Sequence, residues 1–344
     1  MRRPNPLVVL GSGPVGLLAA VRGRQLGMDV EVYTNGLDLS QEPPRVECAP
    51  AQVVALLVEF GVSPRRIGVD GLFQERTIQW SGRAVVAAPA PGVGHIGRPA
   101  LDIALLETAL RAGAKIGALE RGRLEELRGR YRSGECLLLD ASGRSAVTAI
   151  ERIGPKRPLV ARLFHLPMRP SVRDSGLMIA AGPQGYAYRL ANATTLTIGV
   201  VGRKDFVRGD SREIVEKITE FAPWIVRNIP SNHLQSGASG AATAQWSLRD
   251  NFESVLVGDA SFARDALASQ GLAMGFSDAL NGLVEPDPSL RPSEQWRKTG
   301  AISLHCQRIV QQIKSSSFSG ARPWMEYADF LSNRSEISAG PREP

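Results

Sequence analysis

The sequence has few of the residues that mark disulfide-bonded, zinc-binding or membrane-spanning proteins. Its 344 residues include three cysteines, Cys48, Cys136 and Cys306, an odd number without C-x-x-C spacing. This argues against a disulfide framework or a zinc site and fits a reducing cytoplasm. The four histidines lie far apart, so no metal site is predicted. No apolar run approaches the roughly 20 residues of a membrane span, and we expect none.

Lysine is scarce, although the chain is basic. The formal net charge is +7, and only six of the 41 basic residues are lysine, the first being Lys115. A basic balance fits nucleic acid, an acidic protein partner or an anionic substrate. The arginines are scattered and no basic run carries interleaved aromatic residues, so we expect no nucleic-acid partner. An acidic polypeptide partner is compatible with the charge.

The start of the chain contains a glycine-rich motif. Residues 7–20, LVVLGSGPVGLLAA, combine a short apolar run with the spacing G-x-G-x-x-G. In a dinucleotide-binding fold, Gly11 permits the tight turn, Gly13 lets the backbone approach a pyrophosphate, and Gly16 lets the helix pack on the strand. Pro14 suits the first helical turn, where no N–H is needed. The free N–H groups at that helix N-terminus would bind phosphate oxygens.

A β-α-β unit is expected around this motif, with strands over 7–10 and 29–34 and a helix over 14–26. An acidic residue usually ends the second strand and binds the ribose hydroxyls. Thr34 stands there instead. Either the Thr34 hydroxyl or Asp38 could take the place of the acidic residue.

The rest of the chain predicts alternating helices and strands, followed by a different pattern after Pro158. The expected elements are a helix over 50–60, a hairpin over 76–89, a helix and strand over 98–119, a strand near 137–140, a strand at 255–258, and helices over 270–283 and 293–314. Between Pro158 and the strand at 255–258, short strands with glycine and asparagine turns indicate an antiparallel meander. The tail after Gly320 is expected to fray.

Two further glycine-containing stretches follow expected strands. In residues 255–272, VLVGDASFARDALASQGL, the pair Gly258-Asp259 comes directly after a strand and the sequence QGL begins a helix. The other stretch is LLLDASGRS, residues 137–145. An acidic residue after a buried strand can hydrogen-bond a ribityl hydroxyl, and a helix N-terminus can stabilise a reduced flavin. Three such stretches fit one long dinucleotide, so we expect FAD rather than NAD.

Together these stretches resemble the glutathione-reductase-type FAD fold of single-component aromatic hydroxylases and their tryptophan-halogenase-like relatives. VLVGDASF resembles their second FAD motif, and LLDASGRS resembles their D-A-T-G-R-S segment. GRPALDIALLETALRAGA resembles their arginine-containing helix, with Arg98 in the arginine position. RVECAPAQVVALLVEFGV resembles a segment that places Arg45 and Glu47 near the cofactor. The form SQGL and the short length are similar to flavoproteins that hydroxylate a protein tryptophan during tryptophylquinone maturation.

The resemblance implies an α/β fold in which a glutathione-reductase-type FAD-binding domain carries an inserted, mostly antiparallel β-sheet substrate domain. The implied FAD-binding domain comprises residues 1–70, 95–157 and 245–290. The implied substrate domain comprises residues 71–94 and 158–244. Residues 291–344 are expected to form a C-terminal helical segment and tail.

The residues expected to bind FAD lie in the matching motifs. They are Gly11, Gly13, Pro14, Val15, Gly16, Thr34, Arg45, Arg98, Asp140, Gly143, Gly258, Asp259, Gln270, Gly271 and Leu272. Tyr186, Tyr188 and Trp246 are the candidates for an aromatic substrate pocket. No catalytic acid or base is predicted, because in this chemistry the cofactor carries the difficult step.

The implied activity is FAD-dependent hydroxylation of an aromatic group through a flavin C4a-hydroperoxide. The suggested substrate is a tryptophan or other aromatic group of a peptide or protein, and electrons would come from NAD(P)H or a separate flavin reductase. Halogenation is not expected, since GYAYRL replaces the halogenase W-x-W-x-I-P signature and QERTIQW lacks the halogenase lysine. The alternatives are a reductase or dehydrogenase of the geranylgeranyl-reductase type and a flavin-binding protein without turnover.

Overall fold

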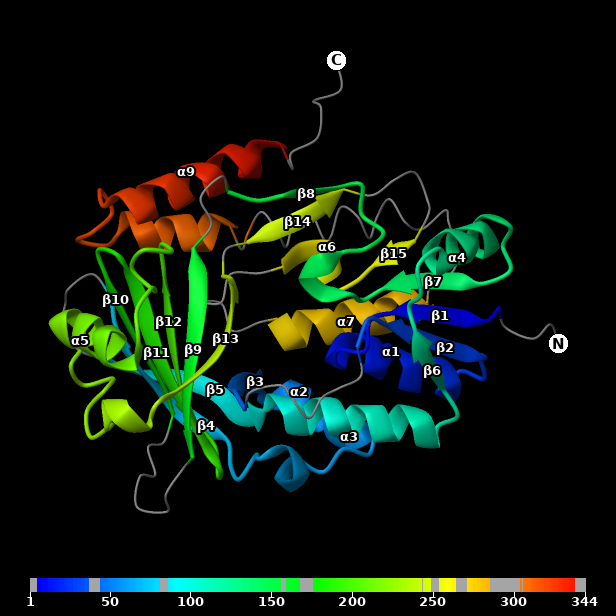
Figure 1. Ribbon diagram of the computed structural model, residues 1–344, viewed down its shortest axis with the longest axis horizontal. Helices are drawn as coiled ribbons and strands as arrows, with labels where there is room; N and C mark the ends of the chain where they lie inside the picture. The colour runs from blue at the N-terminus through cyan, green and yellow to red at the C-terminus, as the bar shows by residue number, and fades with distance from the viewer. Residues whose placement is uncertain are drawn as a thin grey trace.

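The computed structural model places two β-sheet units side by side, a parallel sheet with its helices and a larger curled sheet (Figure 1). The described residues are 5–36, 44–80, 86–155, 159–167, 176–242, 244–248, 254–263, 271–284, 304 and 306–337.

A five-stranded parallel sheet forms the first unit. Its strand order is β15 (Val255–Leu256), β7 (Leu137–Asp140), β1 (Leu7–Leu10), β2 (Val30–Thr34) and β6 (Lys115–Ala118). Every pairing is parallel. The central strand β1 is fully buried, which explains its unbroken apolar sequence, because strands covered on both faces need apolar side chains on both.

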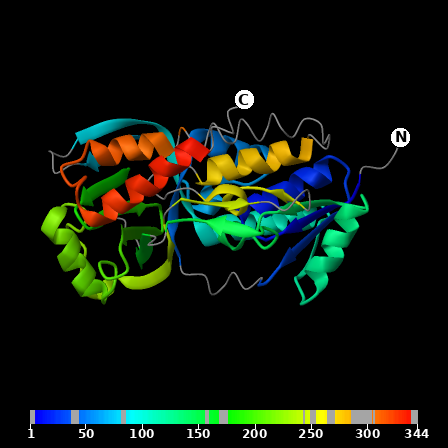
Figure 2. The ribbon, with the colours of Figure 1, turned by 90° about the horizontal axis from the view of Figure 1, so that it is seen from above.

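Helices cover both faces of the parallel sheet. On one face, α1 (Pro14–Gln25), α3 (Arg98–Arg111) and α7 (Gly271–Val284) pack together, and α2 (Ala51–Glu59) joins their core. On the other face lies α4 (Arg123–Arg132) (Figure 2). Short helical turns follow β7 and β15, namely η3 (Gly143–Ser145) and α6 (Asp259–Phe262). The expected β-α-β start is confirmed.

A mixed eight-stranded sheet, sheet B, forms the second unit. Its order is β13 (Gln235–Ala241), β9 (Val160–Pro167), β12 (Thr195–Gly202), β11 (Gly185–Ala191), β10 (Leu177–Gly182), β4 (Phe73–Gln79), β5 (Val86–Gly97) and β3 (Val46–Pro50). Among the described pairings, β10 with β4 is parallel and the others are antiparallel. The expected antiparallel meander and the hairpin over 76–89 are confirmed. A separate two-stranded sheet pairs β8 (Glu151–Ile153) with β14 (Gln245–Leu248).

Alternating side chains divide sheet B between two apolar clusters. On one face, Ala187 and Ile198 pack against α5 (Ser211–Phe221). On the opposite face, Tyr186 and Val201 pack against the C-terminal residues, among them the fully buried Trp324. Two short 3-10 turns, η2 (Pro64–Ile67) and η4 (Ser231–His233), lie outside the longer helices.

The C-terminal segment differs from the expectation. The sequence predicts a frayed tail after Gly320, but α9 (Arg322–Ile337) is a helix. Its Trp324, Tyr327, Ala328 and Leu331 are buried, at the i, i+3, i+4, i+7 spacing of an apolar helical face. The prediction is wrong because it gives the terminal position more weight than this spacing.

The start of helix α5 has a signal in the sequence that the predictions above do not use. Helix α5 begins with a capping box, in which Glu213 N donates to the Asp210 carboxylate and Asp210 N donates to the Glu213 carboxylate. A D-x-x-E pair before an apolar run is a helix-start signal.

Strand β3 lies in the range expected for the FAD-binding domain but pairs with β5 of sheet B.

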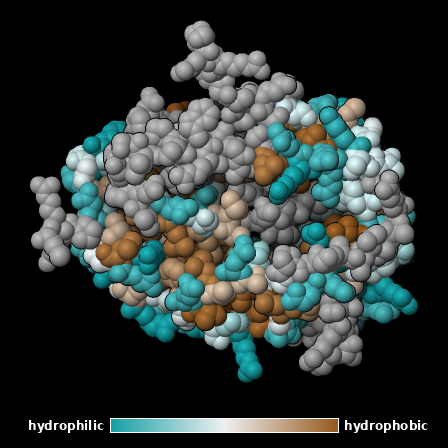
Figure 3. Space-filling model, turned by 180° about the vertical axis from the view of Figure 1, so that it is seen from behind, coloured by the Kyte–Doolittle hydropathy of each residue, from teal (hydrophilic) through white to brown (hydrophobic). Residues whose placement is uncertain are grey.

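The surface opposite to the view of Figure 1 carries a wide apolar area (Figure 3). Exposed large apolar side chains include Val58 of α2 and Leu110 of α3, each 50% exposed. Apolar atoms contribute more than half of the accessible surface of folded proteins, so this is a common feature. Across the described residues, none of the helices combines the length and hydropathy of a membrane span.

We expect Trp324→Ala to lower the free energy of unfolding by about 3–5 kcal/mol, because its side chain is fully buried against sheet B. The matched control is Met325→Ala on the same helix, where the side chain is 47% exposed and the change should stay within about 0.5 kcal/mol. Chemical denaturation followed by circular dichroism measures both. Equal effects would contradict the packing of α9 on sheet B.

Candidate active site

The glycine motif lies between β1 and α1. Gly11 has a φ of +107°, which favours glycine, and a Cβ there would lie 2.5 Å from the carbonyl oxygen of Ala141. A Cβ on Gly16 would overlap with the carbonyl oxygen of Gly11. Gly13 differs, because the nearest atom to its Cβ would be Arg98 Nη2, at 3.9 Å. The packing of the protein requires two of these glycines, whereas Gly13 faces open space.

The N-terminus of α1 presents backbone donors beside that space. The first intrahelical hydrogen bond runs from Leu17 N to Gly13 O, at 3.0 Å. The N–H groups of Val15 and Gly16 precede it and have no intrahelical partner. Pro14 opens the helix, and the first turn has no acidic side chain. This helix end therefore favours an anion such as a phosphate.

A cavity of about 220 Å³, which we call the loop cavity, opens beside this helix end. Its lining joins residues from all three glycine-containing stretches: Gly13, Pro14, Val15, Glu47, Arg98, Ala141, Gly143, Val257, Asp259, Gly271 and Leu272. The strands β1, β7 and β15 all end here. Ligands of open α/β sheets bind at the carboxyl ends of the strands, so the loop cavity is the candidate dinucleotide site.

Thr34 ends β2, as expected. Its Oγ1 accepts a hydrogen bond from Ser12 Oγ at 2.9 Å and donates to Gly36 O at 3.0 Å. Ser12 belongs to the glycine motif, so a pair of hydroxyls stands where a carboxylate is usual. Asp38, the other candidate for this role, lies outside the described residues.

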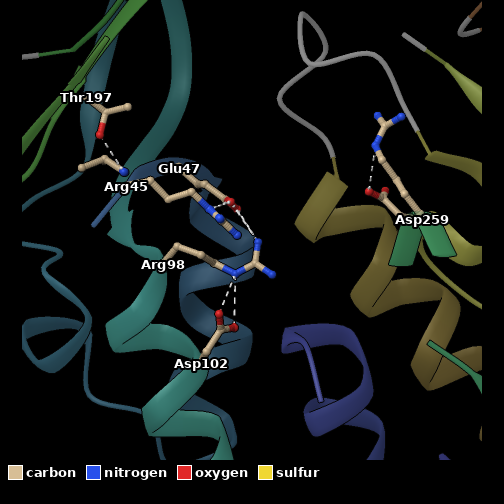
Figure 4. Close-up of polar contacts among 8 residues, drawn as sticks. Arg45, Glu47, Arg98, Asp102, Thr197 and Asp259 are labelled. Atoms are coloured by element: carbon tan, nitrogen blue, oxygen red, sulfur yellow. Dashed lines mark hydrogen bonds and ion pairs between the residues drawn. The ribbon is translucent and has the colours of Figure 1, made fainter. Parts of the chain in front are cut away.

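An ion network links β3 to α3 at the edge of the loop cavity (Figure 4). Arg98 Nη1 donates to Glu47 Oε1 at 2.9 Å, and Arg98 Nε donates to the Asp102 oxygens at 3.1 and 3.2 Å. Arg45 Nε donates to Glu47 Oε1 at 3.2 Å. The two carboxylates hold the Arg98 guanidinium in one position beside Gly13.

The pKa values of Glu47 and Arg98 favour the charged forms of these two groups at neutral pH. Burial would raise the pKa of Glu47, but Arg98 and Arg45 hold that pKa below its ordinary value. Burial would lower the pKa of Arg98, but Glu47 and Asp102 raise that pKa further above its ordinary value. Two positive and two negative groups therefore balance one another within the network.

Asp140 is fully buried at the end of β7. Its Oδ1 accepts from Ser142 N and Oγ at 2.9 and 2.6 Å, and its Oδ2 accepts from Thr148 N and Oγ1 at 2.8 and 2.7 Å. These four hydrogen bonds fold the loop that contains Gly143. The carboxylate thus holds the loop in place, and Ala141 and Gly143 of this loop line the cavity.

Asp259 lies on the wall of the loop cavity, directly after Gly258. Gly258 has a φ of +56°, a conformation that favours glycine. The Asp259 carboxylate is 3.8 Å from Arg144 Nε, and its side chain is 40% exposed. Arg152 Nη2 donates to its carbonyl oxygen at 3.3 Å. The aspartate is anchored through its backbone, while its side chain faces the space where a ligand would lie.

A second cavity, the sheet cavity, lies against sheet B and measures about 210 Å³. Its lining residues are Val46, Glu47, Cys48, Leu177, Ile179, Tyr186, Tyr188, Leu190, Gly271 and Leu272. Glu47, Gly271 and Leu272 also line the loop cavity. The first residues of α7 and the Glu47 side chain therefore stand between two cavities of different character.

Tyr186 and Tyr188, the candidates for an aromatic substrate pocket, both line the sheet cavity. The side chain of Trp246 and all of Gln270 lie outside the described residues. Sequence reasoning missed five lining residues, namely Leu190 of β11 and two pairs, Val46 and Cys48 of β3 and Leu177 and Ile179 of β10. The members of each pair are two positions apart, so they lie on the same face of a strand. This spacing is the sequence signal that could have identified them as neighbours in one cavity wall.

Comparisons with known proteins show the fold. No protein-family model and no curated protein sequence matches the chain. The flavin-dependent brominase Bmp2 is similar with a TM-score of 0.69 and 15% identity over 98% of this chain and 93% of that one. The myxobacterial chondrochloren halogenase CndH is similar with a TM-score of 0.72 and 16% identity, over 97% of this chain and 89% of that one. The peptidyl tryptophan dihydroxylase QhpG, essential for tryptophylquinone cofactor biogenesis, is similar with a TM-score of 0.65 and 18% identity, over 96% of this chain and 78% of that one.

The chain therefore has the fold of FAD-dependent halogenases and hydroxylases. The fold class expected from the sequence is confirmed, with a parallel sheet that carries the glycine motif and a mostly antiparallel sheet beside it.

Gly13→Ala tests the open space at the glycine motif. The variant should be as stable as the wild type, because the new Cβ would meet no atom closer than 3.9 Å. It should weaken the binding of FAD, the cofactor expected from the sequence, by at least about tenfold, or about 1.4 kcal/mol. Fluorescence titration with FAD and thermal unfolding measure the two effects. Gly16→Ala is the control, and it should instead destabilise the fold. Unchanged FAD affinity in a folded Gly13→Ala protein would contradict the assignment.

Arg98→Gln should lower the free energy of unfolding by about 3 kcal/mol at pH 7, because it leaves the buried Asp102 without its cation. Glu47 has a lowered pKa in the folded state, so its contribution to stability is present above the ordinary value of 4.5 and is lost as the pH falls through the folded value. The difference between variant and wild type should therefore shrink in acid. Urea denaturation at several pH values, with Arg111→Gln on the same helix as control, measures it. A difference that stays constant with pH would contradict the network.

Proposed function

We propose that this protein binds FAD in the loop cavity and hydroxylates an aromatic ring held in the sheet cavity. The observation that carries this proposal is that the two cavities share Glu47, Gly271 and Leu272. A reactive ring placed at this shared wall would contact both a polar dinucleotide site and an apolar pocket.

The residues of the loop cavity fit FAD. The N–H groups of Val15 and Gly16 and the space at Gly13 suit its pyrophosphate. Asp259 of this cavity suits a ribityl or ribose hydroxyl as an acceptor. Outside the cavity lining, the hydroxyls of Thr34, at the end of β2, and of Ser12 suit the adenosine ribose. When bound and reduced, FAD would supply the activation of oxygen.

The chain's own contribution at the sheet cavity is to bind and orient the ring and to exclude water. Its walls are mostly apolar, with Leu177, Ile179 and Leu190 from sheet B facing Leu272 of α7. An apolar enclosure protects a reactive oxygen donor from water. Glu47, the charged group among the described lining residues, is already held by Arg98 and Arg45.

Hydroxylation is favoured over halogenation by the lack of a suitably placed lysine. The first lysine of the chain is Lys115, and it lies in β6, the edge strand of the parallel sheet. None of the described residues lining either cavity is a lysine. Halogenation is the second candidate, because structures of halogenases share the fold.

An aromatic group carried on a peptide or protein fits the sheet cavity better than a free amino acid does. The described lining of the sheet cavity offers no unengaged charge for an ammonium or carboxylate group. The net charge of +7 would attract an acidic polypeptide.

Electrons would come from NAD(P)H or from a separate flavin reductase, and we propose a cytoplasmic location.

Purified protein should be yellow, with the absorption bands of flavin, and should consume oxygen when reduced FAD and substrate are supplied. Oxygen electrode measurements and mass spectrometry of the product test this. Incorporation of one oxygen atom into an aromatic ring is expected with chloride or bromide present, and a halogenated product would favour the second candidate instead. Oxygen-independent hydride transfer would favour a reductase, and bound flavin without turnover would favour a binding protein.

The substrate class is tested with free tryptophan, other small aromatics and acidic tryptophan-containing peptides. We expect turnover of the peptides, and we expect their apparent KM to rise with added salt, since salt screens attraction between exposed charges. Efficient hydroxylation of the free aromatics without turnover of any peptide would contradict the peptide proposal.

A further inference from the structure

The Tyr188 hydroxyl is a polar group in the sheet cavity that has no protein partner within the described part of the chain. Tyr188 lies on β11, lines the cavity and is half-buried. No hydrogen bond to its hydroxyl is formed by any described residue. Among the other lining residues, Glu47 is bound by arginines, and the Tyr186 ring packs near Trp324, with centroids 6.3 Å apart.

A glycine on the neighbouring strand fixes the position of this ring. Gly199 of β12 is the direct cross-strand partner of Tyr188. A Cβ at Gly199 would overlap with the Tyr188 ring and lie 2.5 Å from its hydroxyl oxygen. The tyrosine ring therefore lies flat over Gly199, and no other residue type at position 199 would leave room for it. Gly199 thus determines where the hydroxyl points.

The hydroxyl is protonated under ordinary conditions. Burial raises the pKa of Tyr188 far above its ordinary value, and the nearby Glu47 and Cys48 raise it further. A neutral phenol can both donate and accept a hydrogen bond. In a mostly apolar pocket, such a group discriminates between ligands that can form a hydrogen bond with it and ligands that cannot.

We propose that Tyr188 is a specificity-determining residue that orients the substrate ring by accepting a hydrogen bond from a ring-bound N–H or O–H, as in an indole or a phenol. This inference rests on the proposed function of the sheet cavity as the substrate pocket. It adds that the pocket selects rings with a polar hydrogen over plain phenyl or N-alkylated rings.

The test compares the binding of two probes to the FAD-loaded protein by isothermal titration calorimetry, without turnover. The probes are N-acetyltryptophanamide and its 1-methylindole analogue, which lacks the ring N–H. The wild type should bind the first about fivefold more tightly, the effect of one hydrogen bond of about 1 kcal/mol. Tyr188→Phe should reduce this ratio to near one, by weakening the binding of N-acetyltryptophanamide alone.

Two controls separate this effect from a general disturbance. Tyr131→Phe, on α4 and remote from the cavity, should keep the wild-type ratio. FAD affinity should be the same in Tyr188→Phe as in the wild type, because the ring and its packing are retained. Gly199→Ala should also reduce the affinity ratio between the two probes to near one, since its Cβ displaces the Tyr188 ring.

A wild type that does not prefer N-acetyltryptophanamide, or a Tyr188→Phe variant that keeps the preference, overturns the inference. Hydroxylated product, measured by mass spectrometry on the same samples after reduced FAD and oxygen are supplied, distinguishes this failure from failure of the proposed function. A ratio that depends on Tyr188 in a protein without turnover contradicts the proposed reaction and supports the role of Tyr188. Turnover with a ratio that is independent of Tyr188 contradicts the role of Tyr188 alone.

Discussion

The pairing of Glu47 with Arg98 holds the two sheet units together at the candidate site. Glu47 belongs to β3, the edge strand of sheet B, and Arg98 opens α3 beside the parallel sheet. Their ion pair is reinforced by the hydrogen bond from Arg98 N to Arg45 O, at 2.9 Å. Val46 N donates to Thr197 Oγ1 at 2.9 Å and fastens β3 to β12 (Figure 4). Because an unpaired charge in a half-buried position is costly, the shape of both cavities depends on this network remaining complete.

The two cavities differ in chemistry in a way that suits one elongated cofactor and an apolar substrate ring. The loop cavity offers backbone donors, a fixed guanidinium and the Asp259 carboxylate. The sheet cavity offers aliphatic and aromatic walls. The start of α7 belongs to both, so Gly271 and Leu272 mark the boundary where a flavin ring would face its substrate. The fold puts this boundary at the carboxyl ends of β1, β7 and β15, the usual ligand position in open α/β sheets.

Local patterns in the sequence were sufficient for the parallel sheet and its glycine loops but not for contacts between distant segments. The run LVVL and the G-x-G-x-x-G spacing are short-range signals, and β1, α1 and β2 form where they predict. Asp140 follows a strand like a ligand of the cofactor, yet its carboxylate is occupied by Ser142 and Thr148, which only the folded loop reveals. The apposition of Tyr188 and Gly199 depends on the register of β11 and β12. The pairing of β3 with β5 in sheet B likewise depends on tertiary packing. Neither of these two contacts could be predicted from one sequence.

The central claim is that FAD lies in the loop cavity with its reactive ring at the boundary with the sheet cavity. A crystal structure of the protein grown with FAD tests this most directly. The account predicts density for the pyrophosphate next to Gly13 and for the flavin ring beside Gly271 and Leu272, with the sheet cavity left open on its far side. Density for the flavin elsewhere, or a flavin ring that fills the sheet cavity against Tyr188, would contradict it.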